Sequence, residues 1–214
     1  MPYAARVADS VSHPTPPVLT GSLGSPNVSI GGRPAWRALP AALGAAVDAA
    51  SAAVDAIMNT PVTTPVDAEI ALAKAKDDLS GAANAAQAEG VPGARALANT
   101  TLAALDVAND ALVTTWNTAS AAPGGQPAAN EAYGEALQLA VAAAAIAIFA
   151  PLAALFDVHN CAVPVPPHGP GFVTVGSSTV SVNNLPLARK GDSVMEAAGG
   201  ANPISSGCLT VSVG

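Results

Sequence analysis

The sequence has little charge and few aromatic side chains. Only 11% of its 214 residues are charged and 3% are aromatic, whereas 50% are hydrophobic. Disordered chains combine high net charge with few apolar residues, so this composition indicates a folded chain. The formal charge is −7, from eight Lys and Arg against fifteen Asp and Glu. An acidic protein repels phosphate groups, so neither nucleic acid nor an anionic lipid surface is expected as a partner.

Cysteine is scarce as well, and two cysteines in 214 residues make no disulfide framework. Residues 1–10 lack the charged start and apolar core of a signal peptide, so we expect synthesis in the cytoplasm without Sec export. The longest uncharged apolar run, residues 139–156, is near the lower length limit for a membrane span. It is mostly alanine, Pro151 interrupts it and no Lys or Arg flanks it, which favours a buried bundle helix.

The composition changes twice along the chain. Residues 1–39 are rich in Pro, Gly, Ser and Val, residues 40–156 are dominated by alanine, and residues 157–214 return to the first composition. Pro and Gly between short Val and Ile runs are typical of strands and turns. We therefore expect an α+β protein in which one β-type unit, formed by residues 1–39 and 157–214, is interrupted by an all-α insertion.

The insertion contains four stretches with helical character. Turn signals separate them, such as Gly90-Val91-Pro92 and the run of Pro and Gly at residues 123–127. Short connections of this kind favour antiparallel packing of neighbouring helices. The predicted helices cover residues 41–58, 66–89, 93–118 and 128–156.

The outer segments contain an internal repeat. Residues 24–35 match residues 176–187, and residues 207–214 match the first eight positions of both. Each copy alternates Val or Ile with polar residues, as a short strand does. The first two copies then reach Gly31-Gly32 and Asn183-Asn184, residues that tolerate the positive φ angles of a tight hairpin. Residues 2–9 also match residues 186–192, so each repeat predicts a strand, a turn and a Pro-x-x-Arg segment.

These motifs resemble the PAAR-repeat family, named for a proline-alanine-alanine-arginine signature. Residues 2–6 (PYAAR) and 186–189 (PLAR) approximate that signature. The resemblance covers about residues 1–38 and 157–214 and does not extend to the helices. Tyr3, Leu187 and Trp36 stand where the family usually has alanine or another small residue.

The resemblance implies a fold and a function. The family's fold is a small β-cone with pseudo-threefold symmetry, sharpened near its point by bound zinc. Its members sit on the trimeric spike of type VI secretion systems, phage-like contractile tails and related injection machines. The expected function is therefore a non-enzymatic spike tip, a monomer on a threefold spike that helps to puncture the target envelope. Such a protein is assembled on the particle, is delivered outside the cell, touches the target membrane transiently and can carry effector cargo.

All histidines and cysteines lie in the outer segments, which favours a shared metal site, because imidazole and thiolate suit zinc. The family typically gathers three histidines and one cysteine, and this implies the ligand set His13, His159, His168 and Cys208. Cys161 is the reserve ligand and can replace His159, since both lie on one extended segment. Glu196 occupies the place where many relatives have a histidine or cysteine, so Cys208 is expected to supply the third repeat's ligand. A site of this kind is closed and structural.

The strands of the three repeats are the expected spike-binding face. Their backbone edges would extend the strands of the trimer. The residues concerned are Val28, Ile30, Val180, Val182, Val211 and Val213.

Three other interpretations remain open at this point. A Cys–His peptidase would pair Cys161 or Cys208 with His159 or His168, although no local signature of such an enzyme surrounds them. A zinc hydrolase would need an open coordination position and a general base, for which Glu196 is the candidate. A tip-linked effector could act by inserting residues 141–156 into a membrane.

Overall fold

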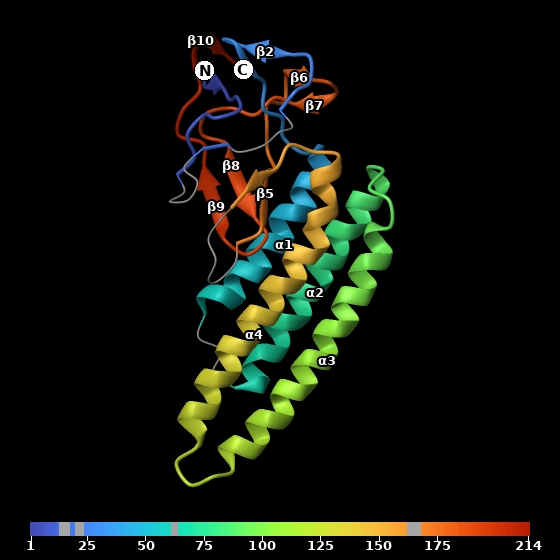
Figure 1. Cartoon of the computed structure of the whole chain (residues 1–214), viewed down its shortest axis with the longest axis vertical. Helices are drawn as coiled ribbons and strands as arrows, with labels where there is room; N and C mark the ends of the chain where they lie inside the picture. Colours follow the sequence, from blue (N-terminus) through green and yellow to red (C-terminus); the bar gives the residue numbers. More distant parts are fainter. Residues whose placement is uncertain (13–17, 20–23, 61–63, 162–167) are drawn as a thin grey trace.

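The computed structural model describes residues 1–214 except 13–17, 20–23, 61–63 and 162–167. The fold is α+β, with four helices and small antiparallel sheets. Short two-stranded sheets and both chain ends lie at one end of an elongated molecule, and the helices run away from them to the other end (Figure 1). We call the end with the two-stranded sheets the hairpin end.

Four α-helices span α1 Ala41–Asn59, α2 Pro65–Ala88, α3 Ala94–Ser120 and α4 Gln126–Phe149. The prediction of four helices is confirmed, and their boundaries agree within two residues except at the end of α4. There the chain continues as a 3-10 helix, η1 Ala150–Ala154, instead of an α-helix to residue 156. Pro151 explains the difference, because it lacks the N–H that an α-helix needs at that position.

The helices pack through small side chains and share their core with the β part. In α2, five of the seven buried residues are alanine. The main hydrophobic cluster extends beyond the helices to Leu39, Val158 and Phe172. The helical insertion and the strands are therefore joined by one continuous core, and burial at their junction stabilises both.

Three two-stranded antiparallel sheets form the hairpin end. They pair β2 Ser29–Ile30 with β3 Arg33–Pro34, β6 Ser181–Val182 with β7 Leu185–Pro186, and β1 Tyr3–Ala4 with β10 Cys208–Ser212. The first two turn on Gly31-Gly32, with φ of +54° and +80°, and on Asn183-Asn184, with φ of +52° and +62°. These are the positive φ angles predicted from the glycine and asparagine pairs. The third sheet joins the two ends of the chain (Figure 1).

A three-membered ring of backbone hydrogen bonds links the segments that follow these sheets. Ala5 N–H donates to Ala188 O at 2.9 Å, Ala188 N–H to Trp36 O at 2.9 Å, and Trp36 N–H to Ala5 O at 3.0 Å. Two residues further along each segment, the N–H groups of Val7, Ala38 and Lys190 link the segments in the opposite order, because they donate to the carbonyls of Pro34, Pro186 and Tyr3. The same contacts thus occur three times within one chain.

Each of the three segments also carries an arginine paired with an aspartate. Arg6 binds Asp9 with 2.8 Å between Nη2 and Oδ1, and Arg189 binds Asp192 with 3.0 Å between the same atoms. In both pairs the arginine backbone N–H also donates to the carboxylate. Arg37 makes the corresponding contacts with Asp157, at 2.8 Å from its backbone N–H and 2.5 Å from Nη2.

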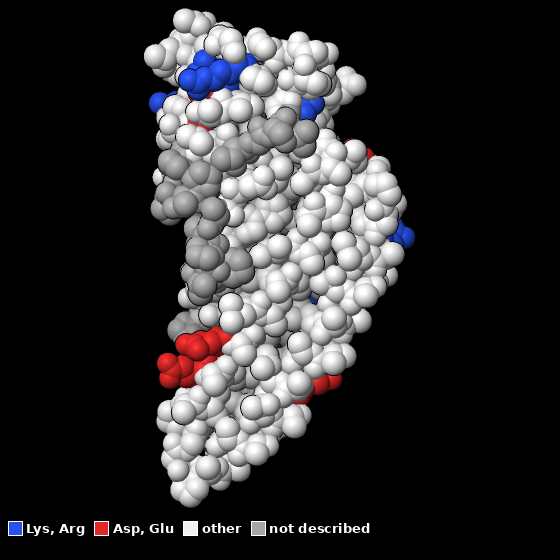
Figure 2. Space-filling view, viewed as in Figure 1, with Lys and Arg blue, Asp and Glu red and all other residues white. Residues whose placement is uncertain are grey.

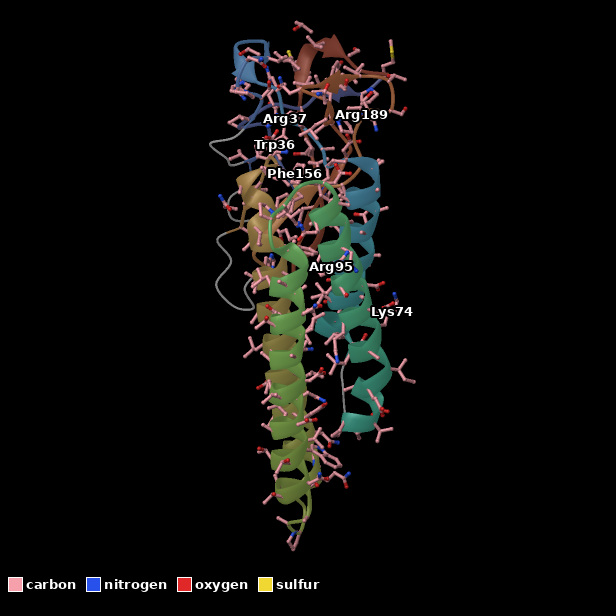
Figure 3. The ribbon with its side chains drawn as sticks, turned by 90° about the vertical axis from the view of Figure 1, so that its right-hand side faces the viewer. Trp36, Arg37, Lys74, Arg95, Phe156 and Arg189 are labelled. Carbon is pink, nitrogen blue, oxygen red and sulfur yellow. The ribbon has the colours of Figure 1, made fainter. Side chains whose placement is uncertain are left out.

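The third pair adds a copy of the signature to the two found in the sequence. Pro34-Ala35-Trp36-Arg37 occupies the same structural position as residues 3–6 and 186–189. Only two residues separate Arg6 from Asp9, but the whole helical insertion separates Arg37 from Asp157. Figure 3 shows Arg37, Trp36 and Phe156 one below another where the hairpin end meets the helices, with Arg189 at the level of Arg37.

A four-stranded antiparallel sheet, which the sequence pattern did not predict, lies between the hairpin end and α1. Its order is β4 His159–Asn160, β5 Pro170–Val173, β8 Ser193–Glu196 and β9 Gly200–Pro203. Helix α1 packs against β8 and β9. A second hydrophobic cluster, with Trp36 as its largest member, covers Val173 and Val194 of this sheet.

Candidate metal centre

Strand register brings His159 and Glu196 together across the four-stranded sheet. His159 pairs with Gly171 on one side of β5, and Glu196 pairs with Gly171 on the other. Directly paired residues point to the same face of a sheet. Gly171 has no side chain, and a Cβ there would lie 3.1 Å from Glu196 Cγ. The glycine therefore leaves room for His159 Nε2 and Glu196 Oε1 to approach to 3.6 Å.

His168 and Cys161 complete the cluster. His168 Nδ1 lies 2.7 Å from Glu196 Oε2. One ligand atom each of Cys161, His168 and Glu196 lie within 4.8 Å of one another. Gly199 permits this approach, because a Cβ on it would lie 2.5 Å from His168 Nδ1 and would overlap the Glu196 carboxylate. Two glycines thus make the space in which the polar side chains meet.

The cluster is buried on one side and accessible on the other. The side chains of Glu196 and His159 are fully buried, that of His168 is 21% exposed, and Cys161 is partly exposed. A buried carboxylate is costly unless a cation or hydrogen-bond donors compensate it. Protonated histidine or a bound metal ion can each supply that positive charge.

The donor set fits a divalent metal ion with a preference for nitrogen and sulfur. Thiolate, imidazole and carboxylate are all zinc ligands, with bond lengths of about 2.0 to 2.3 Å. Two ligand atoms on one tetrahedral zinc are therefore about 3.5 Å apart, within the separation found in the cluster. Cys161, His168 and Glu196 could hold a metal ion together, with His159 next to Glu196.

The predicted ligands have different positions in the structure. Of the set His13, His159, His168 and Cys208, the structure brings His159 and His168 to the cluster. The reserve ligand Cys161 is one of the three residues that could hold the metal together, whereas His159 lies beside them, with Nε2 3.6 Å from Glu196 Oε1. His13 lies outside the described residues. Cys208 lies at the hairpin end, so within the described part of the chain it is not part of the cluster.

Cys208 instead occupies a turn position that serine fills in the other two repeats. Ser25 Oγ accepts the backbone N–H of Val28, three residues on, and Ser177 Oγ accepts that of Val180 in the same way. Cys208 Sγ lies 3.3 Å from the Thr210 hydroxyl, as Ser177 Oγ does from Thr179. Hydrogen bonding from Thr210, with a smaller contribution from the charge of Arg6, lowers the pKa of the Cys208 thiol.

Sequence reasoning named Glu196 only as a candidate general base and missed it as a metal ligand, and it missed Arg37–Asp157 as a structural pair. Glu196 shares the buried face of β8 with Val194, which lies two residues before it. An acidic residue on the core face of a strand is unusual and indicates a polar partner. Pro34-Ala35-Trp36-Arg37 also carries the proline and arginine of the signature. The alignment of Cys208 with Ser25 and Ser177 already indicated a shared turn role.

The residues expected to bind a partner gather at the hairpin end. Val182 and Val213 are buried in a small cluster with Ala4, Ala35 and Leu187, and Val28, Ile30 and Val211 pack against it half-buried. Val180 is 38% exposed. Val182 and Val213 therefore belong to the core beneath the expected binding surface, whereas Val180 is accessible on that surface.

Comparison of the chain with protein-family models, with curated proteins and with solved structures found no match.

Proposed function

We propose that the protein is a metal-stabilised tip that caps the trimeric spike of a contractile injection machine. The observation that supports this most is the three-membered hydrogen-bond ring of Ala5, Trp36 and Ala188. A single chain that meets a trimer on its threefold axis must present three similar surfaces from its own sequence. The repeated sheets, rings and Arg–Asp pairs are what a pseudo-threefold β-cone of the PAAR type requires.

The proposed docking surface is the hairpin end. Three short sheets meet there, and their strands leave backbone edges that can extend the strands of a partner. Leu209 is 76% exposed and Val180 is 38% exposed on this part of the chain. The helices run away from the hairpin end (Figure 1), so in this orientation they would point away from the spike and towards the target.

The proposed role of the metal is structural. Zinc held by Cys161, His168 and Glu196, with His159 as the candidate fourth ligand, would cross-link β4, β8 and the segment before β5. Its chemistry there would be to compensate the buried Glu196 carboxylate and to stabilise a unit with few large side chains. With His159 as the fourth ligand, four protein side chains would fill the tetrahedral coordination of zinc and leave no position for water, which favours a structural site over a hydrolase or peptidase centre, so we assign no catalytic role.

Membrane insertion by the helices is less well supported. Helix α1 and the stretch Gln126–Ala154 are long and apolar enough to cross a membrane by length and composition alone. However, Val141, Ala145 and Phe149 of α4 are fully buried in the core that the four helices share. Insertion would require the bundle to open and lose this core, whereas a rigid bundle suits a tip that is pushed through an envelope.

Docking is tested by co-purification with the trimeric spike protein of the same injection machine. We expect one chain per spike trimer, because the three repeats use all three protomers. Val180→Glu places a charge on the hairpin end and should abolish co-purification. Leu139→Glu changes an apolar residue on α4 that is 50% exposed and should leave it unchanged. Binding of three chains per trimer, or equal binding by both variants, would contradict the proposal.

The metal is tested by elemental analysis of the purified protein. We expect one zinc ion per chain, retained in Cys208→Ser and lost in Cys161→Ser. The two substitutions remove the same thiol group, so they separate the cluster from the serine-like turn. A folded wild-type protein without metal, or a loss of zinc in Cys208→Ser alone, would refute the assignment of the cluster.

A further inference from the structure

The three repeats meet at three equivalent junctions, where the end of one short sheet lies against the turn that precedes the next strand. At the first junction Asn183 accepts from Ser25 Oγ at 2.6 Å and donates to Asn27 Oδ1 at 2.9 Å. At the second, Gly214 O accepts from the hydroxyls of Ser177 and Thr179, at 2.6 and 2.8 Å. Both junctions are closed by hydrogen bonds.

The third junction has no hydrogen bond of this kind between repeats among the described residues. Gly31 stands there in the place that Asn183 takes at the first junction, and it faces the turn of Cys208 and Thr210. A Cβ on Gly31 would lie 2.9 Å from Arg6 Nη1 and 3.0 Å from Cys208 Sγ, so the glycine lets the Arg6 guanidinium and the Cys208 thiol pack against its turn. A cleft of about 580 Å³ lies beside this junction, and Arg6, Arg33 and Thr210 are among the residues that line it.

Two arginines make this cleft different from the other junctions. Arg33 follows the turn of the first sheet, at the position that Leu185 takes in the second. Its side chain is 49% exposed, and its contacts to Asp9 Oδ1 and Ala8 O are long, at 3.4 Å each. Figure 2 shows that Lys and Arg side chains gather at the hairpin end of the face in view, away from the acidic groups over the helices.

The cleft has one carboxylate for its two guanidinium groups. Asp9 receives Arg6 through Nε and Nη2, at 3.1 and 2.8 Å, and Arg33 only weakly. Among the residues that the structure describes, Arg6 Nη1 has no hydrogen-bond acceptor. One positive charge and several N–H donors therefore remain for a ligand. Guanidinium groups bind carboxylate and phosphate oxygens in pairs, more tightly than neutral donors do.

We propose that the cleft between Arg6 and Arg33 is a binding site for one oxyanion group, a carboxylate or a phosphate. The ligand would lie in the cleft and would accept hydrogen bonds from both guanidinium groups. This site is separate from the candidate metal centre and does not depend on the spike-tip function.

The test follows the arginine Nε–H signals of the full chain by NMR while inorganic phosphate or glutarate is added at constant ionic strength. We expect saturable shifts of Arg6 and Arg33 with at least one of the two anions, and the anion that binds identifies the ligand chemistry. In Arg33→Leu, which copies Leu185, the apparent Kd read from Arg6 should rise by about tenfold or more. Lys190→Leu removes an exposed cation outside the cleft and should bind as the wild type does.

A second variant tests the position of the ligand. Gly31→Asn copies Asn183, but a Cβ at residue 31 would lie 2.9 Å from Arg6 Nη1, so the substitution forces the Arg6 guanidinium to move. The displacement of Arg6 should weaken binding by a similar factor. The proposal is overturned if neither anion gives a saturable shift, if Arg33→Leu binds as the wild type does, or if Gly31→Asn leaves the affinity unchanged.

Discussion

Replacement of Trp36 tests whether the three-membered ring encloses a real core. Trp36 is 1% exposed and packs with Val11, Leu19 and Ile204 beneath the ring. The other two ring positions are alanines, so the backbone accepts Trp36→Ala and the substitution removes only side-chain volume. In the sequence this tryptophan stands where the family usually has a small residue. In the structure its side chain fills the space that the three segments enclose.

The expected loss follows from buried area and one hydrogen-bond donor. A buried tryptophan covers about 200 Å², equivalent to about 5 kcal/mol at 25 cal/mol per Å². Trp36 Nε1–H has no hydrogen-bond partner among the described residues, and an unpaired buried donor costs about 1 to 3 kcal/mol. We therefore expect Trp36→Ala to lower the free energy of unfolding by about 3 kcal/mol, at the low end for such substitutions.

Urea denaturation followed by helical circular dichroism measures this loss. Because the helices share a core with the strands, the unfolding of the helices should report the lost stability. In thermal unfolding the same loss should lower Tm by about 6 to 12 °C. Trp36→Phe keeps most of the apolar area and removes the unpaired donor, so its loss should stay below about 1 kcal/mol. A loss below about 1 kcal/mol for Trp36→Ala, or equal losses for the two variants, would refute the reasoning.

Three further predictions concern single side chains. Arg37→Leu leaves the fully buried Asp157 carboxylate without its partner and should cost about 3 to 5 kcal/mol in urea denaturation; a loss under 1 kcal/mol would show that the pair is dispensable. Cys208→Ser should fold normally. The pKa of the Cys208 thiol is lowered, chiefly by Thr210, so its contribution is complete above the unfolded pKa near 9.0 and is lost as pH falls through the folded value. Wild-type stability should therefore rise relative to Cys208→Ser between pH 7 and 9, and parallel pH profiles would contradict this. Gly199→Ala should lower the zinc content of the purified protein, because the new methyl group overlaps the cluster; unchanged zinc would place the metal elsewhere.

The candidate site shows where sequence reasoning succeeds in part. The sequence predicted one metal site from the histidines and cysteines of the outer segments. In the structure His159, Cys161 and His168 do lie near one another. Glu196 was noted as a departure from the family pattern and as a candidate general base, but not as a metal ligand. Its role depends on the pairing of Gly171 with both neighbouring strands, and strand pairing between distant segments cannot be read from a local pattern.

Cys208 and Arg37 show two ways in which a partner is missed from the sequence. Cys208 was assigned to the metal through the family pattern, although its alignment with Ser25 and Ser177 indicates a turn. Arg37 lacks an aspartate three residues on, so its pairing cannot be read along the chain, because Asp157 lies on the other side of the helical insertion. The partner of Cys208, Thr210, is local, whereas the partner of Arg37 is 120 residues away.

The sequence by itself determined the four helices, the two tight turns and the repetition of the outer segments. These features depend on contacts between residues close in the chain, namely helical periodicity, glycine and asparagine at positive φ, and proline and glycine at the helix ends. Only the tertiary structure decided which aspartate Arg37 binds, which side chains form the polar cluster, and which of the three junctions places two arginines in a cleft. Those outcomes depend on how distant segments are set against one another, and a change of one residue in strand register would rearrange them all.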